Sequence, residues 1–111
     1  MNRETTMPIF RLGPRDLRES VRANIRTILL TGRGEIPFRP RFGLGAERLL
    51  GGGMADIDLA FEVADQLNRY EKRIRLKQVE QHDEGPGHKR VTIRYEILQT
   101  GQEESLTLKN D

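Results

Sequence analysis

The sequence contains no cysteine and no tryptophan, has only two tyrosines, and has no long apolar run near its start. Without cysteine the chain forms no disulfide and carries out no thiolate chemistry. Without a long apolar run there is no signal peptide or membrane span, so we expect a cytoplasmic protein with no membrane partner. The scarcity of aromatic rings argues against nucleic acid, whose bases stack on such rings.

The 111 residues are 35% hydrophobic and 32% charged, which predicts one domain (residues 1–111) with an aliphatic core and a disordered start (residues 1–7). The net charge is only +2, yet it is unevenly distributed. Most arginines lie in the first half: Arg11, Arg15, Arg18, Arg22, Arg26, Arg33, Arg39, Arg41 and Arg48. The segment 54–68 carries only acidic charge: Asp56, Asp58, Glu62 and Asp65. Such a division suits docking between unlike neighbours, or the two halves partly neutralise each other.

Two amphipathic helices are expected. The first begins at Pro14, because proline suits the first helical position, and its buried face is Leu17, Val21, Ile25 and Ile28. The second begins with Asp56 as N-cap and ends near Tyr70 or Lys72. Its predicted apolar stripe is Ile57, Ala60, Phe61, Ala64 and Leu67. Between them, residues 46–50 can form one helical turn.

Glycine and proline interrupt the pattern between these helices. Gly32 lies where a helix C-cap adopts positive φ. Pro37 and Pro40 exclude a helix, so we expect Gly34 to Phe42 to be extended and to run along the edge of a sheet. Two aromatic residues of this segment are predicted core residues: Phe38 and Phe42.

One side of the first helix carries an arginine stripe, defined as Arg15, Arg18, Arg22 and Arg26. The planar, always-charged guanidinium suits an acidic protein partner or a phosphate backbone. The lack of stacking aromatics favours a protein partner over nucleic acid. The alternative is a solvated helix face.

The remainder of the chain predicts three antiparallel strands. Residues 74–81 form the first, and Val79 breaks its alternation, which indicates a bulge or a twist. Residues 90–98 alternate clearly, with Val91, Ile93, Tyr95 and Ile97 on one face. Ser105–Leu108 is a last short strand, and Pro8–Leu12 could form another at an edge. The expected fold is α+β, with two helices on a small, mainly antiparallel sheet that ends in a three-stranded meander.

Several short strings occur in a characteristic order: Leu30-Thr31, Gly34-Glu35, Pro40, Phe42-Gly43, Leu49-Leu50 and Tyr70-Glu71-Lys72-Arg73-Ile74. Between Pro14 and Leu108 the chain resembles the "lysozyme-like" baseplate wedge family of contractile phage tails and type VI secretion systems. The resemblance implies a structural component that docks to other wedge subunits and offers a sheet edge for sheath assembly.

The resemblance assigns docking to Glu71 and Arg73, with Lys72 standing where the family has proline. Because proline would end the helix and lysine lets it run on, the angle of this docking knob could differ here. Arg33 and Glu35 complete the expected partner-binding set. The edge expected to face the sheath is Ser105, Leu106, Thr107 and Leu108. An intramolecular ion pair of Arg73 is the alternative interpretation.

Two other functions are compatible with the same residues. The family also resembles small regulatory anti-adaptor proteins, which bind an adaptor and block delivery of a protease substrate. A peptidoglycan muramidase would need two carboxyl groups across a cleft, for which Glu35 and Glu71 are the best pair. Each lies beside an arginine, Arg33 or Arg73, so ion pairing explains them more simply. We therefore expect a non-enzyme.

No cofactor, metal or small-molecule substrate is expected. The residues nearest to a metal-binding set surround a Gly-Pro-Gly turn: His82, Asp83, Glu84 and His88. A turn does not hold ligands rigidly, and no further ligand lies nearby in the sequence. The chain also lacks a phosphate-binding loop and a nucleophile elbow.

Overall fold

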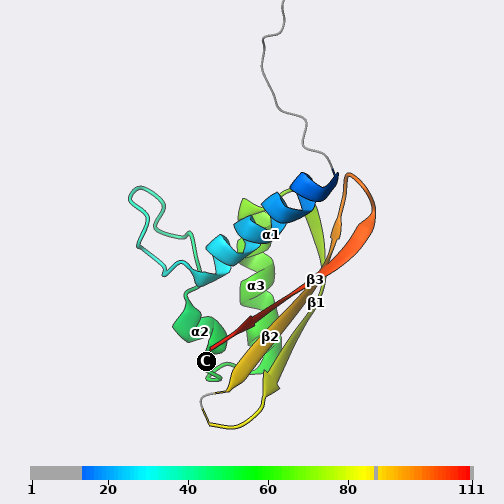
Figure 1. The fold of residues 1–111 in the computed structure, drawn as a ribbon. Coiled ribbons are helices and arrows are strands. Elements are labelled where there is room, and N and C mark those ends of the chain that lie inside the picture. Colours follow the sequence, from blue (N-terminus) through cyan, green and yellow to red (C-terminus); the bar gives the residue numbers. More distant parts are fainter. Residues whose placement is uncertain (1–13, 87, 111) are drawn as a thin grey trace, which may run out of the picture.

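A computed structural model describes residues 14–86 and 88–110 (Figure 1). The helices are α1 (Pro14–Leu30), α2 (Ala46–Leu50) and α3 (Asp56–Tyr70), and the strands are β1 (Ile74–Asp83), β2 (Lys89–Ile97) and β3 (Gln102–Lys109). The predicted α+β class and three-stranded meander are confirmed. The predicted strand at Pro8–Leu12 and the predicted disorder of residues 1–7 lie outside the described residues.

The three strands form an antiparallel sheet in the order β1-β2-β3. β1 carries a bulge between Leu76 and Gln78, as the broken alternation predicts. The extra residue places Val79 opposite Ile93, so the apolar side chains after the bulge return to the face they occupied before it.

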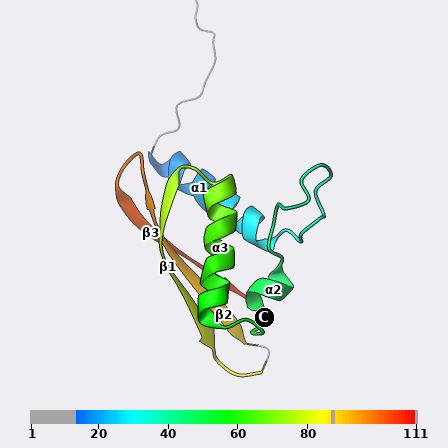
Figure 2. The ribbon, with the colours of Figure 1, turned by 180° about the vertical axis from the view of Figure 1, so that it is seen from behind.

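One face of the sheet is buried beneath α1 and α3, as two opposite views show (Figures 1 and 2). Each element contributes the face that its periodicity requires. The core includes Leu17, Val21, Ile25, Ile28 and Leu29 from α1, Leu59, Val63 and Leu67 from α3, and Ile74, Val91, Ile93, Tyr95, Ile97, Leu106 and Leu108 from the sheet. The predicted buried faces of α1 and β2 are confirmed.

The predicted stripe of α3 is wrong in part. Ile57 and Phe61 are 78% and 72% exposed, and the buried stripe is Leu59, Val63, Gln66 and Leu67. The helix has apolar residues on two sides. Because the polar Gln66 interrupts the side that is buried, the sequence pattern pointed to the other side. The helix N-cap is Ala55 rather than Asp56, and no side chain caps it.

The segment from Gly34 to Phe42 is not extended and does not follow the sheet edge. It forms successive turns closed by three backbone bonds: Glu35 to Gly32, Arg39 to Ile36 and Phe42 to Arg39. It projects from the body near the C-terminal end of α1 and α2 (Figure 1). Positive φ occurs at Gly34 (88°) rather than at Gly32. Phe42 is buried as predicted, whereas Phe38 lies fully in solvent.

Candidate docking site

The junction between α3 and β1 is built around the carboxylate of Glu71. The chain leaves the helix at Glu71, where φ is −132° and ψ is 94°. The side chain then turns inward and is only 1% exposed. It accepts hydrogen bonds from Arg73 Nη2 (2.7 Å), Arg73 Nε (3.0 Å), the Arg73 backbone N–H (2.9 Å) and Asn24 Nδ2 (2.8 Å). The acceptor sites of this carboxylate are therefore well occupied.

Arg73 connects this junction to α1. While Nε and Nη2 face Glu71, Nη1 donates to Ser20 Oγ at 3.0 Å. Asn24, one turn further along the same helix, also contacts the junction. The arginine side chain nevertheless remains 37% exposed. Glu71 is thus an internal group, and Arg73 is a fixed cation whose side chain is partly exposed.

The electrostatics of the pair follow from these bonds. Burial raises the pKa of Glu71, but hydrogen bonds from Arg73 and Asn24 outweigh burial and leave its pKa below the ordinary value. The hydrogen bond to Glu71 raises the pKa of Arg73. Both groups are therefore ionised at neutral pH, and the intramolecular ion pair is present.

Lys72 does not extend the helix. α3 ends at Tyr70, and the exposed Lys72 reaches back so that Nζ donates to the Asn68 carbonyl oxygen at 2.7 Å. A lysine at this position supplies a positive charge to the C-terminal end of the helix dipole. The junction therefore turns without the proline, because the Glu71 side chain fixes the turn.

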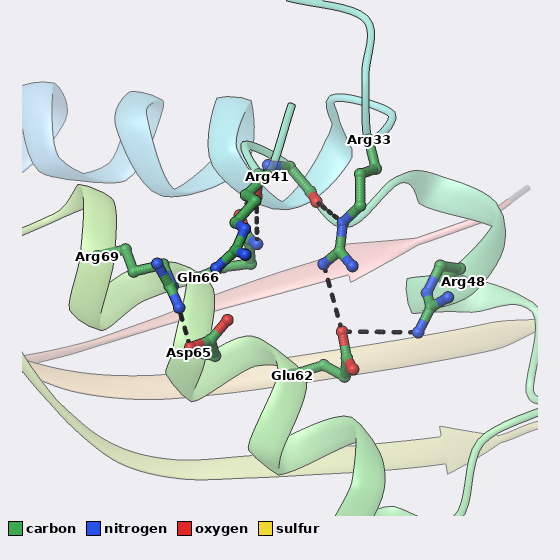
Figure 3. Close-up of polar contacts among 8 residues, drawn as sticks. Arg33, Arg41, Arg48, Glu62, Asp65, Gln66 and Arg69 are labelled. Carbon is green, nitrogen blue, oxygen red and sulfur yellow. Dashed lines mark hydrogen bonds and ion pairs between the residues drawn. The ribbon is translucent and has the colours of Figure 1, made fainter. Parts of the chain in front are cut away.

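The base of the projecting loop is clamped to α3 by Gln66, which sequence reasoning missed (Figure 3). The buried amide accepts from the Gly43 backbone N–H (2.7 Å) and donates to the Arg41 carbonyl (2.9 Å). One signal was present in the sequence, since Gln66 is a polar residue at a position of an apolar stripe.

Arg33 and Glu35 do not form the ion pair that their proximity in sequence suggests. Arg33 donates from Nε to the Gly43 carbonyl (3.3 Å) and from Nη2 to Glu62 (3.5 Å), which Arg48 also approaches (Figure 3). The carboxylate of Glu35 lies instead against Gly32. The two residues therefore have different structural roles. Arg33 fastens the loop to α3, and Glu35 fills the space beside Gly32.

An aromatic stack joins the loop to the Glu71 junction. The guanidinium carbon of Arg39 lies 4.8 Å from the ring centroid of Phe42 and 5.0 Å from that of Tyr70. The two rings meet edge to face, with centroids 4.8 Å apart. Because Tyr70 immediately precedes Glu71, the loop and the junction form one connected surface.

The free edge of β3 is partly covered by the arginine stripe. The Asn110 N–H donates to the carbonyl of Lys89, an odd-numbered residue of β2. Because backbone groups alternate in direction along a strand, all odd-numbered residues of β2 direct their N–H and C=O groups to β3. Ser105 pairs with the even-numbered Arg94, so its own backbone groups face the free edge. There Arg22 Nη1 donates to the Ser105 carbonyl at 3.0 Å.

A second arginine supports this contact. Arg18 Nε lies 2.9 Å from Glu104 Oε2, on the strand beside Ser105. Two members of the stripe therefore bind β3 of their own chain, which neither sequence interpretation anticipated. The backbone groups of Leu106 and Leu108 face β2, so Ser105 and Thr107 are the residues of the predicted edge that an incoming strand would pair with.

Residues 15–102 match the family model described as "Baseplate wedge protein gp25". This chain belongs to that family. The fold is similar to the crystal structure of a candidate tail lysozyme from Geobacter sulfurreducens, with 27% sequence identity, a TM-score of 0.70, and coverage of 91% of this chain and 94% of that chain. A comparison with curated proteins found no match. Membership of the wedge family makes the chain a structural component of a baseplate.

Two of the four residues around the Gly-Pro-Gly turn form ion pairs instead of a metal site. Asp83 lies 2.6 Å from Lys89 Nζ, and Glu84 lies 2.8 Å from Arg90 Nη2. Within residues 14–86 and 88–110, no three histidine or acidic side chains gather as metal ligands. None of the helices there is long and apolar enough to cross a membrane.

Proposed function

We propose that this wedge protein docks to other baseplate subunits of a contractile injection machine through the accessible face of Arg73 and the adjacent Lys72. The observation that carries the proposal is the geometry of Arg73. Its guanidinium is held by Glu71 on one side and by Ser20 on another, and the side chain as a whole is 37% exposed. A fixed guanidinium recognises a carboxylate with little further loss of conformational entropy.

In this proposal Glu71 does not touch the partner. Its buried carboxylate orients Arg73 and closes the turn after α3, so it acts on docking through the arginine. The same geometry disfavours a muramidase, which needs one carboxyl group with a raised pKa to protonate the leaving oxygen. The pKa of Glu71 is lowered instead.

The second part of the proposal concerns the sheath. The backbone groups of Ser105 and Thr107 face the free edge of β3, and an extended strand from a sheath subunit can pair with them. Such a strand would replace Arg22 at the Ser105 carbonyl. The arginine then works as a cover that the correct strand displaces, and the paired edge becomes the template for the first sheath ring.

Docking is tested with the tagged chain co-expressed with the other wedge subunits of the same tail. Lys72→Glu reverses a solvent-exposed charge beside Arg73, and we expect about tenfold weaker recovery of those subunits, because like charges would then face each other. Lys77→Glu, on the exposed bulge of β1, is the matched control and should recover them as the wild type does.

Circular dichroism and thermal unfolding confirm that both variants are folded. Normal recovery by folded Lys72→Glu and by folded Arg73→Lys would contradict the docking surface. Recovery of a single adaptor protein by the wild type, with no wedge subunit, would instead support the regulatory alternative.

A further inference from the structure

The projecting loop carries an aromatic ring in an unusual position. Phe38 is 100% exposed, and its φ is 66°, in the left-handed region. A bulky side chain is strained there, and such strain persists only where the surrounding structure imposes it. The ring contributes nothing to the core, so the stability of this chain does not explain either its exposure or its backbone.

The surroundings of Phe38 impose its conformation. Phe38 is the third residue of a turn that is closed by the bond from Arg39 N–H to the Ile36 carbonyl at 3.1 Å, and a second turn, from Phe42 N–H to the Arg39 carbonyl at 3.1 Å, follows directly. The next residue, Arg39, is stacked on two aromatic rings, and Gln66 clamps the end of the loop. The loop is therefore an ordered projection with a phenyl ring at its tip.

The charge around this tip is mainly positive. Arg39 and Arg41 follow Phe38 and are exposed, and Arg33 lies at the base of the loop. Glu35 is the acidic residue of the segment 33–42, and its carboxylate lies back against Gly32. A complementary surface would therefore have an apolar centre and an acidic border.

We propose that Phe38 is a preformed anchor that enters an apolar pocket bordered by carboxylates on a neighbouring baseplate subunit. This inference rests on the proposed docking function and adds a second contact to it. Rigid aromatic side chains that fill a pocket dominate the binding energy of interfaces and lose little entropy on binding. A protein pocket is favoured over a membrane surface, because a single ring buries too little apolar area for stable membrane attachment.

The positive φ of Phe38 makes it possible to remove the ring without destabilising the fold. Glycine accepts a φ of 66° freely, so Phe38→Gly removes the ring and relieves the strain together. We expect a melting temperature equal to or above that of the wild type, and recovery of co-expressed wedge subunits reduced about thirtyfold. Phe38→Leu, which keeps an apolar side chain, should retain part of the binding.

Phe61→Ala is the matched control, because it removes another exposed ring from a different surface, on α3. It should leave recovery unchanged. A photoreactive benzoylphenylalanine at position 38 should crosslink to one wedge subunit, at a site with apolar residues and neighbouring carboxylates.

The outcomes separate the two proposals. If the wild type recovers no wedge subunit, the docking function fails and the anchor fails with it. If the wild type recovers them and Phe38→Gly recovers them equally, the anchor alone is overturned. Sedimentation with anionic phospholipid vesicles that depends on Phe38 would also overturn it, because the ring would then belong to a membrane surface.

Discussion

Glu71 holds a buried negative charge by local contacts that the sequence only partly reveals. Arg73 lies two residues away, and both side chains were predicted to matter at this junction. Asn24 and Ser20 come from α1, far away in sequence, and nothing in their own neighbourhood predicted this role. Burial alone would raise the pKa of Glu71, so the lowered pKa depends on the hydrogen bonds from Arg73 and from the distant Asn24.

The Glu71→Gln variant tests this carboxylate. Because the folded pKa lies below the ordinary value of 4.5, the wild type gains stability from ionised Glu71 above that pH and loses it as the pH falls through the folded pKa. The variant should be about 2 kcal/mol less stable at pH 7, with a weaker loss of stability towards pH 3. Urea unfolding between pH 3 and pH 7 measures both effects.

Glu103→Gln, at an exposed position of β3, controls for the loss of one negative charge. It should unfold at the wild-type urea concentration at pH 7. Equal stability of Glu71→Gln and wild type across this pH range would show that the buried ion pair contributes nothing.

At the scale of elements, β3 combines two roles in eight residues. Leu106 and Leu108 face the core, and the backbone groups of Ser105 and Thr107 face the free edge. The alternation that predicted a strand could also predict the buried face. It could not predict that β3 is an edge strand beside α1, because strand order depends on how the meander closes.

Thr107→Pro tests strand addition at this edge. Since the Thr107 backbone N–H faces away from β2, proline removes a donor at the free edge and spares the ladder to β2. We expect a folded domain that docks to wedge subunits but nucleates little or no sheath, measured by electron microscopy of assembled tails. Thr107→Val keeps the N–H and should assemble normally. Normal sheath assembly on the proline variant would show that β3 is not the template for the sheath.

At the scale of the whole molecule, the proposals place docking and sheath assembly on different surfaces. The loop and the Glu71 junction form one connected surface through Tyr70, whereas the free edge of β3 lies beside α1. An uncovered strand edge promotes association between identical chains, and long arginine side chains oppose it. We therefore expect Arg18 and Arg22 to support the solubility of the free subunit as well as the timing of assembly.

Replacing Arg18 and Arg22 together by alanine should expose this edge. We expect the double variant to remain folded, because both arginines are at the surface, and to self-associate more strongly than the wild type as concentration rises. Analytical ultracentrifugation over a range of concentrations measures the change. Arg26→Ala, one turn further along α1, is the control and should sediment as the wild type. A monomeric double variant would show that the arginines do not protect the edge.

The sequence by itself determined the start of α1, the strand meander, the bulge in β1 and the buried faces of α1 and β2. These features follow from local periodicity and from the backbone limits of proline and glycine, which act over a few residues. The order of the short strings also indicated the wedge family, which the family match then confirmed.

Only the tertiary structure decided which side of α3 packs, where Phe38 lies and which carboxylate Arg33 meets. Each of these depends on residues far apart in the sequence: Gln66 satisfies the loop backbone, Tyr70 supports Arg39, and Glu62 receives Arg33. The side of α3 that contains Gln66 can be buried because the Gln66 amide finds hydrogen-bond partners in the loop. Those partners are in place only once the chain has folded.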